Sequence, residues 1–253
     1  MQSSQPDPKK GEREYFARIG PKGIRHATLK PFSEDNCAAN LAHLDALFHF
    51  LTPPPARIVE FGCGTGWLSL FLATRGYAVT AVDIAPEAVA AAKRQQELRG
   101  IAGAEFLVGD YEHPVAGTGF DYALFFDALH HAEDEQLAVQ RAYDALRPGG
   151  AMIAFETREG HSETEISRRA VAEFGVHEKD MSCAKIAELG RRSGFSRHLI
   201  LPRAHETMRS LYRPSYAKAT GQFDLRVRLL LSKLRVIRRL FTSADEQFVV
   251  LWK

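Results

Sequence analysis

Short apolar segments with strand-like composition alternate with segments of helical periodicity through most of the chain. This alternation predicts a parallel sheet with helices on both faces, because a crossover between parallel strands needs a connection about as long as a helix. Such crossovers are right-handed, which leads to a doubly wound α/β fold. Seven strands are expected, in ARIVEFG, YAVTAVDI, AEFLVGD, FDYALFFD, AMIAFET, SRHLILP and EQFVVLWK.

The composition is that of a globular protein. Hydrophobic residues make up 45% of the 253 residues and the formal net charge is +2, which indicates neither disorder nor general nucleic-acid binding. Cys37, Cys63 and Cys183 have no CxxC spacing, so we expect no disulfide framework and a reducing, cytoplasmic location. The opening MQSSQPDPKKGERE predicts a loose polar tail and not a signal peptide, and we find no run of about 18 apolar residues that would predict a membrane span.

The segment VEFGCGTGW places a glycine-rich loop directly after the first strand. Gly62, Gly64 and Gly66 allow a tight turn and a close approach of backbone to a ligand. In open α/β sheets, ligands bind at the carboxyl ends of the strands, where this loop lies. The spacing G-x-G-x-G followed by Trp67 departs from the G-x-G-x-x-G pattern of dinucleotide sites, and Glu60 precedes the first glycine by two residues.

This loop and the strand ends that follow it resemble the motifs of class I S-adenosylmethionine-dependent methyltransferases. The resemblance runs in order from about Arg57 to Phe155 and includes AVDI, VGD, FDYALFFDALHH and LRPGG. It implies a seven-stranded Rossmann-like methyltransferase sheet that binds S-adenosyl-L-methionine. Glu60 would hold the methionine amine, Asp83 the ribose hydroxyls and Asp110 the adenine amino group. The full set of predicted cofactor-binding residues is Glu60, Gly62, Cys63, Gly64, Gly66, Asp83, Ile84, Asp110, Tyr111 and Phe126.

Each motif also has a purely structural interpretation. A G-x-G-x-G segment is often only a tight turn, Asp83 could cap the helix that begins near Pro86, and Asp110 could form a turn. All of these structural interpretations would have to be correct at once for the chain to have no cofactor site.

The end of the fourth strand carries the candidates for catalysis. Methyl transfer needs an acceptor positioned in line with the methyl group, and an oxygen acceptor usually needs a base as well. Asp127, His130 and His131 are the catalytic candidates, although one histidine of such a pair often only packs. Glu156 and Thr157 are expected to line the acceptor pocket. We expect no metal site, because adjacent histidines do not share one helical face and no third ligand is expected to lie nearby.

The acceptor is constrained mainly by exclusion. The Asn/Asp-Pro-Pro-aromatic segment of adenine-N6 enzymes is replaced by DALH, and the Pro-Cys dipeptide of cytosine-C5 enzymes is missing. We therefore expect oxygen methylation of a small-molecule or carbohydrate-type acceptor, with a phosphate-bearing or lipid-linked group as one form of it. A faint similarity to bacterial methyltransferases of surface-polysaccharide pathways favours a glycan. Alternatives are an RNA methyltransferase and a non-catalytic S-adenosylmethionine-binding regulatory module.

The chain divides into a core and two appendages. We predict an N-terminal tail and helical lid at 1–56, the cofactor-binding core at 57–202, a basic helical insertion at 203–245 and the last core strand at 246–253. Lys22, Arg25, His26 and Lys30 of the lid are candidates for binding an anionic acceptor.

The insertion should emerge over the acceptor site, because the sixth strand is expected to run parallel to the first five. Its segment 225–241 is a basic amphipathic helix, which predicts either packing on the core or contact with the anionic inner face of a membrane. Nucleic-acid binding is disfavoured, because Phe241 is the only aromatic residue in this basic run. The run therefore lacks the several aromatic side chains on which single-strand binders stack bases.

Overall fold

A seven-stranded sheet forms the centre of the molecule. The computed structural model describes residues 7–33, 37–114, 117–241 and 246–253. The strand order is β3-β2-β1-β4-β5-β7-β6. The strands are β1 (Arg57–Phe61), β2 (Ala78–Asp83), β3 (Ala104–Val108), β4 (Phe120–Phe126), β5 (Leu146–Phe155), β6 (Arg197–Pro202) and β7 (Glu246–Trp252), and each overlaps a predicted segment. The predicted fold class is confirmed.

The strand directions place a ligand site at one edge of this sheet. β1 to β5 are parallel, and β7 is antiparallel to both β5 and β6. β6 therefore runs in the same direction as β5, as expected. The chain moves outward from β1 to β3 and then returns to β4 on the other side of β1. The carboxyl ends of β1 and β4 flank this switch point, where open α/β sheets bind their ligands.

The start of β5 differs from the prediction, which began the fifth strand at Ala151, after LRPGG. Leu146 already pairs with Phe120, and the next pair is Ala151 with Tyr122, so 147–150 bulge out of the ladder. Arg147 fixes this bulge, since its Nε donates to Oδ1 of Asp121 at 2.7 Å.

Two apolar cores cover the two faces of the sheet. The first is built with α3 (Cys37–Phe48), α4 (Trp67–Arg75) and α5 (Pro86–Arg99), and the second with α6 (Glu135–Ala145) and α8 (Cys183–Ser193). The strands supply side chains to both cores in alternation, as Ile58 and Val59 of β1 do. This packing fixes the strand ends that carry the site.

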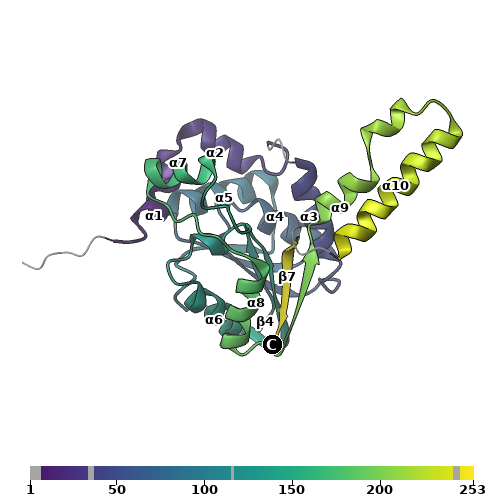
Figure 1. The fold of residues 1–253 in the computed structure, drawn as a ribbon. Coiled ribbons are helices and arrows are strands. Elements are labelled where there is room, and N and C mark those ends of the chain that lie inside the picture. Colours follow the sequence, from purple (N-terminus) through teal and green to yellow (C-terminus); the bar gives the residue numbers. More distant parts are fainter. Residues whose placement is uncertain (1–6, 34–36, 115–116, 242–245) are drawn as a thin grey trace, which may run out of the picture.

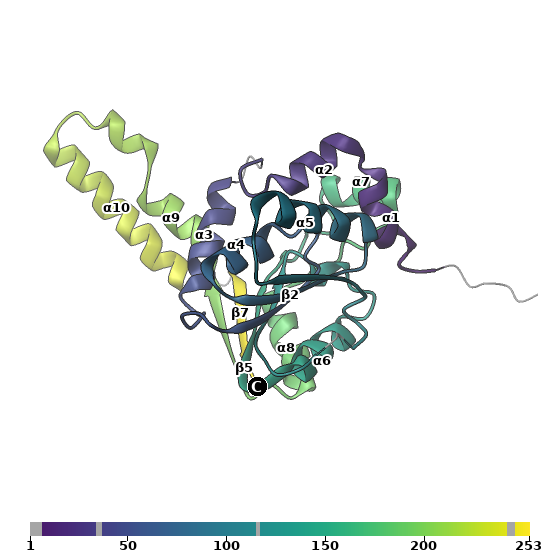
Figure 2. The same cartoon turned by 180° about the vertical axis from the view of Figure 1, so that it is seen from behind.

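Three further helices form a cover over the carboxyl end of the sheet. We call α1 (Lys10–Arg18), α2 (Gly20–Thr28) and α7 (Glu165–Phe174) the cover; they lie side by side in both views (Figures 1 and 2). The rings of Tyr15 and Phe174 meet edge to face, and Arg18 donates to the carbonyl of Phe174 at 2.8 Å. The prediction of a loose tail as far as Glu14 is wrong for 10–14, which are helical; residues 1–6 lie outside the described residues.

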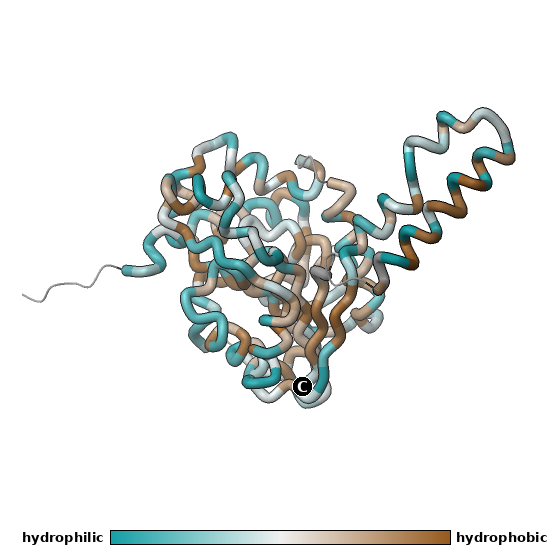
Figure 3. Tube along the Cα trace, in the orientation of Figure 1, coloured by the Kyte–Doolittle hydropathy of each residue, from teal (hydrophilic) through white to brown (hydrophobic). Residues whose placement is uncertain are grey.

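The segment between β6 and β7 forms an arm that projects from the body. It consists of α9 (Ala204–Leu211), the 3-10 helix η2 (Pro214–Lys218) and α10 (Gln222–Leu240) (Figure 1). α9 packs on α3, while α10 extends outward beside α9. Figure 3 shows apolar residues repeating along α10. The predicted helical character of the insertion agrees with this arrangement, whereas the domain boundaries stay a prediction.

Replacing Gly66 by alanine should destabilise the fold more than the same change at Gly100. Both residues have left-handed backbone, with φ of +77° and +60°, so alanine should cost about 1–2 kcal/mol at either position. A Cβ on Gly66 would also lie 2.6 Å from Cε1 of Phe106 and 2.8 Å from Cβ of Ala92, which adds about 1–3 kcal/mol. At Gly100, the described residues leave the Cβ position open. Urea unfolding measures both changes, and equal losses would contradict this difference in packing.

Candidate active site

A cavity of about 510 Å³ lies at the carboxyl ends of β1, β2 and β4, beneath α1 and α2. Every predicted cofactor residue except Gly66 lines it, as do Asp127, His130 and His131. Gly66 instead packs behind the loop, against Phe106. The structure thus brings the sequence candidates together, while their individual roles stay predictions.

Asp83 ties the glycine loop to the end of β2. Its Oδ2 accepts the N–H of Gly64 at 2.7 Å, and its Oδ1 accepts the N–H of Ala85 at 2.9 Å. Asp83 does not cap α5, because Ala85 is the N-cap residue and this helix has no side-chain cap hydrogen bond. The contact of Asp83 with Ala85 forms a turn before the helix, and its contact with Gly64 holds the glycine loop. Burial raises the pKa of Asp83, partly offset by these two hydrogen bonds. Each oxygen keeps a further lone pair for a ligand hydroxyl.

Glu60 presents a buried carboxyl to the same cavity. Ser69 Oγ donates to its Oε2, and only 3% of the residue is exposed. Burial raises the pKa of Glu60 to about 8, partly offset by the hydrogen bond from Ser69. A nearby cation would favour the charged carboxylate again, so Glu60 suits a positively charged ligand group.

Lys9 closes the third side of the cavity, next to Asp110. Its Nζ lies 2.7 Å from Oδ2 of Asp110 and 2.6 Å from Oε1 of Glu112. Burial opposes ionisation of Asp110, but the hydrogen bonds from Lys9 and from the N–H of Glu112, together with the positive charge nearby, outweigh it and lower the pKa. Sequence reasoning missed Lys9, and no local signal marks it within the polar KKGERE segment.

The chain after β4 is held by Glu156. Oε1 of this buried carboxylate accepts the N–H groups of Ala128 and Leu129 at 2.9 and 2.7 Å, and Oε2 lies 2.8 Å from Nδ1 of His130. Burial alone would lower the pKa of His130, but the hydrogen bond and charge of Glu156 raise it to about 9. Asp127 has φ of 57°, and its N–H donates to the carbonyl of Phe155 at 2.7 Å.

His131 lies directly against His130, with ring centroids 4.0 Å apart. Its Nδ1 is 2.6 Å from the backbone carbonyl oxygen of His177. Burial, together with the charge of His130, holds the pKa of His131 well below its usual value. Both rings belong to the short 3-10 helix η1 (Leu129–His131), which sets them side by side.

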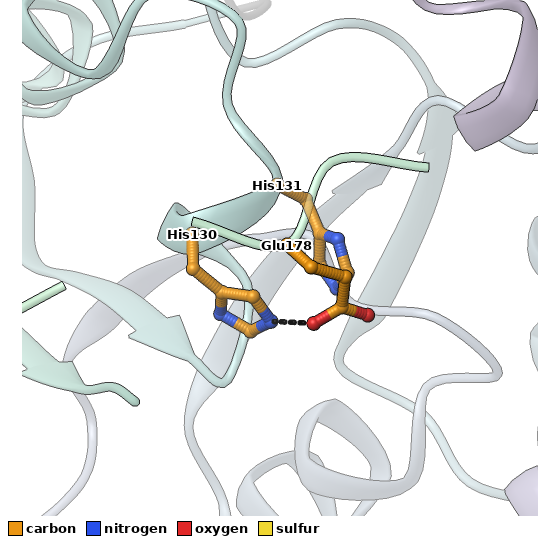
Figure 4. Close-up of side chains that lie close together, drawn as sticks. All are labelled: His130, His131 and Glu178. Carbon is orange, nitrogen blue, oxygen red and sulfur yellow. Dashed lines mark ion pairs between the residues drawn. The ribbon is translucent and has the colours of Figure 1, made fainter. Parts of the chain in front are cut away.

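The expectation that no third ligand lies near the two histidines is wrong. Glu178, which follows α7, reaches them from far along the chain, and its Oε2 lies 3.9 Å from Nε2 of His130 (Figure 4). The sequence could not indicate this neighbour, because 47 residues separate it from His131 (178 − 131) and no periodicity connects them.

Several other expectations about the acceptor side are also corrected. Glu156 and Thr157 do not line the cavity, since Glu156 lies behind His130 and Thr157 Oγ1 donates to the carbonyl of Lys179 at 3.4 Å. Of the four basic lid candidates, Lys30 lines the cavity and Lys22, Arg25 and His26 do not. In the described part of the chain no arm residue lines it either, so the insertion does not cover the site. The residues that sequence reasoning missed include Lys9, Glu12, Tyr15, Phe16, His161 and Glu178.

Comparisons with known proteins agree with this geometry. A family model described as "Methyltransferase domain" matches residues 59–154. The chain is 34% identical over 161 residues to a malonyl-[acyl-carrier protein] O-methyltransferase of Enterobacter lignolyticus, covering 62% of this chain and 58% of that protein. It is 32% identical over 136 residues to a ubiquinone biosynthesis O-methyltransferase of Xanthomonas campestris, covering 53% and 52%. The chain thus spans a little over half the length of these curated relatives.

A solved structure extends the similarity of fold beyond the matched region. Phosphoethanolamine N-methyltransferase 2 of Haemonchus contortus, in complex with S-adenosyl-L-methionine, aligns with a TM-score of 0.63 at 18% identity, covering 95% of this chain and 59% of that one. The sheet and its glycine loop are those of the class I methyltransferase fold. With the matched domain, they show that this chain carries a methyltransferase domain at 59–154 on a class I methyltransferase fold.

Removing the charge of Lys9 should loosen the cover. Lys9→Met would leave Asp110 and Glu112 without their buried cation, so α1 should detach from the cavity more often. Hydrogen–deuterium exchange of residues 10–18 should rise about tenfold or more, since losing a buried ion-pair partner is worth more than 1.4 kcal/mol. Lys10→Met is the matched control, because Lys10 is largely exposed. Unchanged exchange in Lys9→Met would show that the ion pair does not hold the cover.

Proposed function

We propose that this chain transfers a methyl group from S-adenosyl-L-methionine to an oxygen atom of a small acceptor molecule. The observation that carries the proposal is the convergence of Glu60, Asp83 and Asp110 on a single cavity that extends to His130. Its volume of about 510 Å³ lies within the range of about 300–1,000 Å³ that is usual for small-molecule sites.

The residues present fit the cofactor of the family. The buried carboxyl of Glu60 suits the cationic amine, and the oxygens of Asp83 can accept from a pair of ribose hydroxyls. Asp110 can accept from the adenine amino group, although it shares its carboxylate with Lys9. When bound, the cofactor supplies an electrophilic methyl group on a sulfonium centre.

The pair of His130 and Glu156 is proposed to orient the acceptor oxygen. Glu156 fixes one ring nitrogen of His130, so Nε2 remains on the cavity side for contact with an acceptor. Asp127 and His131 complete this wall and are proposed as further acceptor-side residues. The cover lies over the cavity and would exclude water from the reaction.

The names of the curated relatives support the acceptor class. Both curated relatives described above are named as O-methyltransferases, and one of them acts on a malonyl group carried by a protein. A small anionic or hydroxyl-bearing acceptor is therefore proposed, with a carbohydrate as the second candidate. An RNA substrate is disfavoured, because the basic arm does not line the cavity among the described residues.

Calorimetry with S-adenosyl-L-homocysteine tests the cofactor half of the proposal. Asp83→Asn should weaken binding at least about tenfold, because an amide offers one acceptor oxygen where the carboxylate offers two. Asp45→Asn is the matched control, since Asp45 is exposed on α3. Equal affinity in Asp83→Asn and the control would remove Asp83 from the site, and a wild-type protein that binds no cofactor product would overturn the proposed function.

Measuring methyl transfer to a panel of hydroxyl and carboxyl acceptors tests the proposed reaction. His130→Ala should lower kcat about 100-fold or more while leaving S-adenosyl-L-homocysteine affinity within about threefold. Cofactor binding without turnover on any acceptor would favour a non-catalytic regulatory module. RNA affinity that falls steeply with salt would favour an RNA methyltransferase.

We also propose that the arm contacts an anionic bilayer surface. Six apolar residues of the arm follow one another at spacings of four and three residues and are all at least 39% exposed: Phe223, Val227, Leu230, Leu234, Ile237 and Phe241. Exposed Arg226, Lys233, Arg235 and Arg238 flank this stripe. Two identical basic helices would repel each other, whereas an anionic surface complements both the charge and the apolar stripe. No described helix is both long enough and apolar enough to cross a membrane.

Cosedimentation with vesicles tests the role of the arm. The protein should bind phosphatidylglycerol vesicles and not phosphatidylcholine vesicles, because the arm combines positive charge with exposed apolar residues. Changing Leu230 and Leu234 together to serine should reduce binding about tenfold or more, since each leucine contributes roughly 1–2 kcal/mol when it is buried. Leu98→Ser removes a leucine of α5 that is even more exposed, as a control. Equal binding to both kinds of vesicle would refute the preference for an anionic surface, and binding to neither would refute membrane contact.

A further inference from the structure

Three potential metal ligands meet on the acceptor side of the cavity. His130 and His131 come from η1, and Glu178 comes from the segment after α7 (Figure 4). One ligand atom from each lies within 4.8 Å of the other two. All three residues line the cavity, so an ion held there would face the acceptor.

The hydrogen bonds of the two imidazoles leave the same ring nitrogen free on each. A backbone carbonyl only accepts, so the contact of His131 Nδ1 with the carbonyl of His177 requires the proton to be on Nδ1. A neutral His131 then has its lone pair on Nε2. Glu156 accepts from Nδ1 of His130 in the same way, so Nε2 of His130 is its ligand atom once a bound ion displaces the proton on that nitrogen. Metal-binding histidines are oriented by such a carbonyl or carboxylate on their other nitrogen.

Glu178 can serve as the third ligand without losing its anchor. Its Oε2 lies 2.6 Å from Nε2 of His161, and the second lone pair of this oxygen can bind an ion while this contact remains. Ligands about 2.0–2.2 Å from one ion are at most about 4.0–4.4 Å apart. The 3.9 Å between Nε2 of His130 and Oε2 of Glu178 is within this limit, and all three ligand atoms lie within 4.8 Å of one another.

We propose that His130, His131 and Glu178 bind one divalent transition-metal ion, such as Zn²⁺, Mn²⁺ or Co²⁺, beside the acceptor position. Two imidazole nitrogens and one carboxylate suit these ions, whereas Mg²⁺ prefers ligands that are all oxygen. Three protein ligands leave open positions in the coordination shell for an acceptor oxygen.

The role of the ion in catalysis rests on the proposed function, whereas its binding does not. A hydroxyl group bound to such an ion loses its proton to water more readily, because the metal stabilises the resulting oxyanion. His130 and His131 would then act on the acceptor oxygen through the ion.

Cobalt titration of the full-length, untagged, chelator-treated protein tests the site. One Co²⁺ per chain should bind, with visible absorption bands that report its nitrogen and oxygen ligands. His131→Ala should weaken binding about 100-fold or more, and Glu178→Gln should do so while preserving the shape of the side chain. His161→Ala, which removes the anchor of Glu178 and a ring packed against His130, should weaken binding about 10–100-fold. His49→Ala removes an exposed histidine of the surface and should change nothing.

The outcomes separate this proposal from the proposed function. Failure of the wild-type protein to bind Co²⁺ or Zn²⁺ at millimolar concentration would overturn it, as would unchanged binding in both His131→Ala and Glu178→Gln. Thermal unfolding confirms that each variant is folded, and Glu178→Gln decides the matter if the alanine variant is not. S-adenosyl-L-homocysteine affinity is measured on the metal-free protein, so its loss would count against the cofactor site alone.

Discussion

The acceptor side of the cavity depends on the buried carboxylate of Glu156. It accepts backbone N–H groups from Ala128 and Leu129 and the ring of His130, so one charge fixes both the path of the chain after β4 and the orientation of an imidazole. Asp127, just before this segment, has a left-handed backbone that non-glycine residues adopt only at a cost. The hydrogen bonds to Glu156 offset that cost. Removing Glu156 would therefore release the whole wall and not a single contact.

The cover also uses buried charged side chains to hold separate segments together, here at the mouth of the cavity. Lys9 reaches Asp110 and Glu112 on the cofactor side, and Glu12 accepts the N–H of His177 at 2.6 Å on the acceptor side. Burial raises the pKa of Glu12 to about 7. The first turns of α1 thus connect two regions that belong to opposite sides of the switch point. Closing this helix orders both halves of the site at once, which suits a reaction from which water must be excluded.

The sequence predicted the parts of this protein that depend on local order. Strand ends such as Glu60, Asp83 and Asp110 are found from apolar runs and turn residues, because the direction of parallel strands brings their carboxyl ends to one edge. The part played by Lys9, His161 and Glu178 could not be predicted, since it arises from contacts between segments far apart in the chain. For the arm, the sequence predicted the helices but not their position. The packing of α9 on α3 directs them away from the cavity.

The cofactor side of the cavity is built mainly from residues close together in the chain, whereas the acceptor side is built from segments that are far apart. The matched family region, 59–154, includes the glycine loop and the acidic strand ends, and it stops just before Glu156. Glu178, His161 and the α1 residues that face the acceptor side all lie outside it. A sheet edge built from local sequence can be shared by many proteins, whereas an acceptor wall assembled from distant segments can change without disturbing the sheet. The chemistry that distinguishes this chain from its relatives should therefore be sought in the contacts of η1 with the cover and with Glu178.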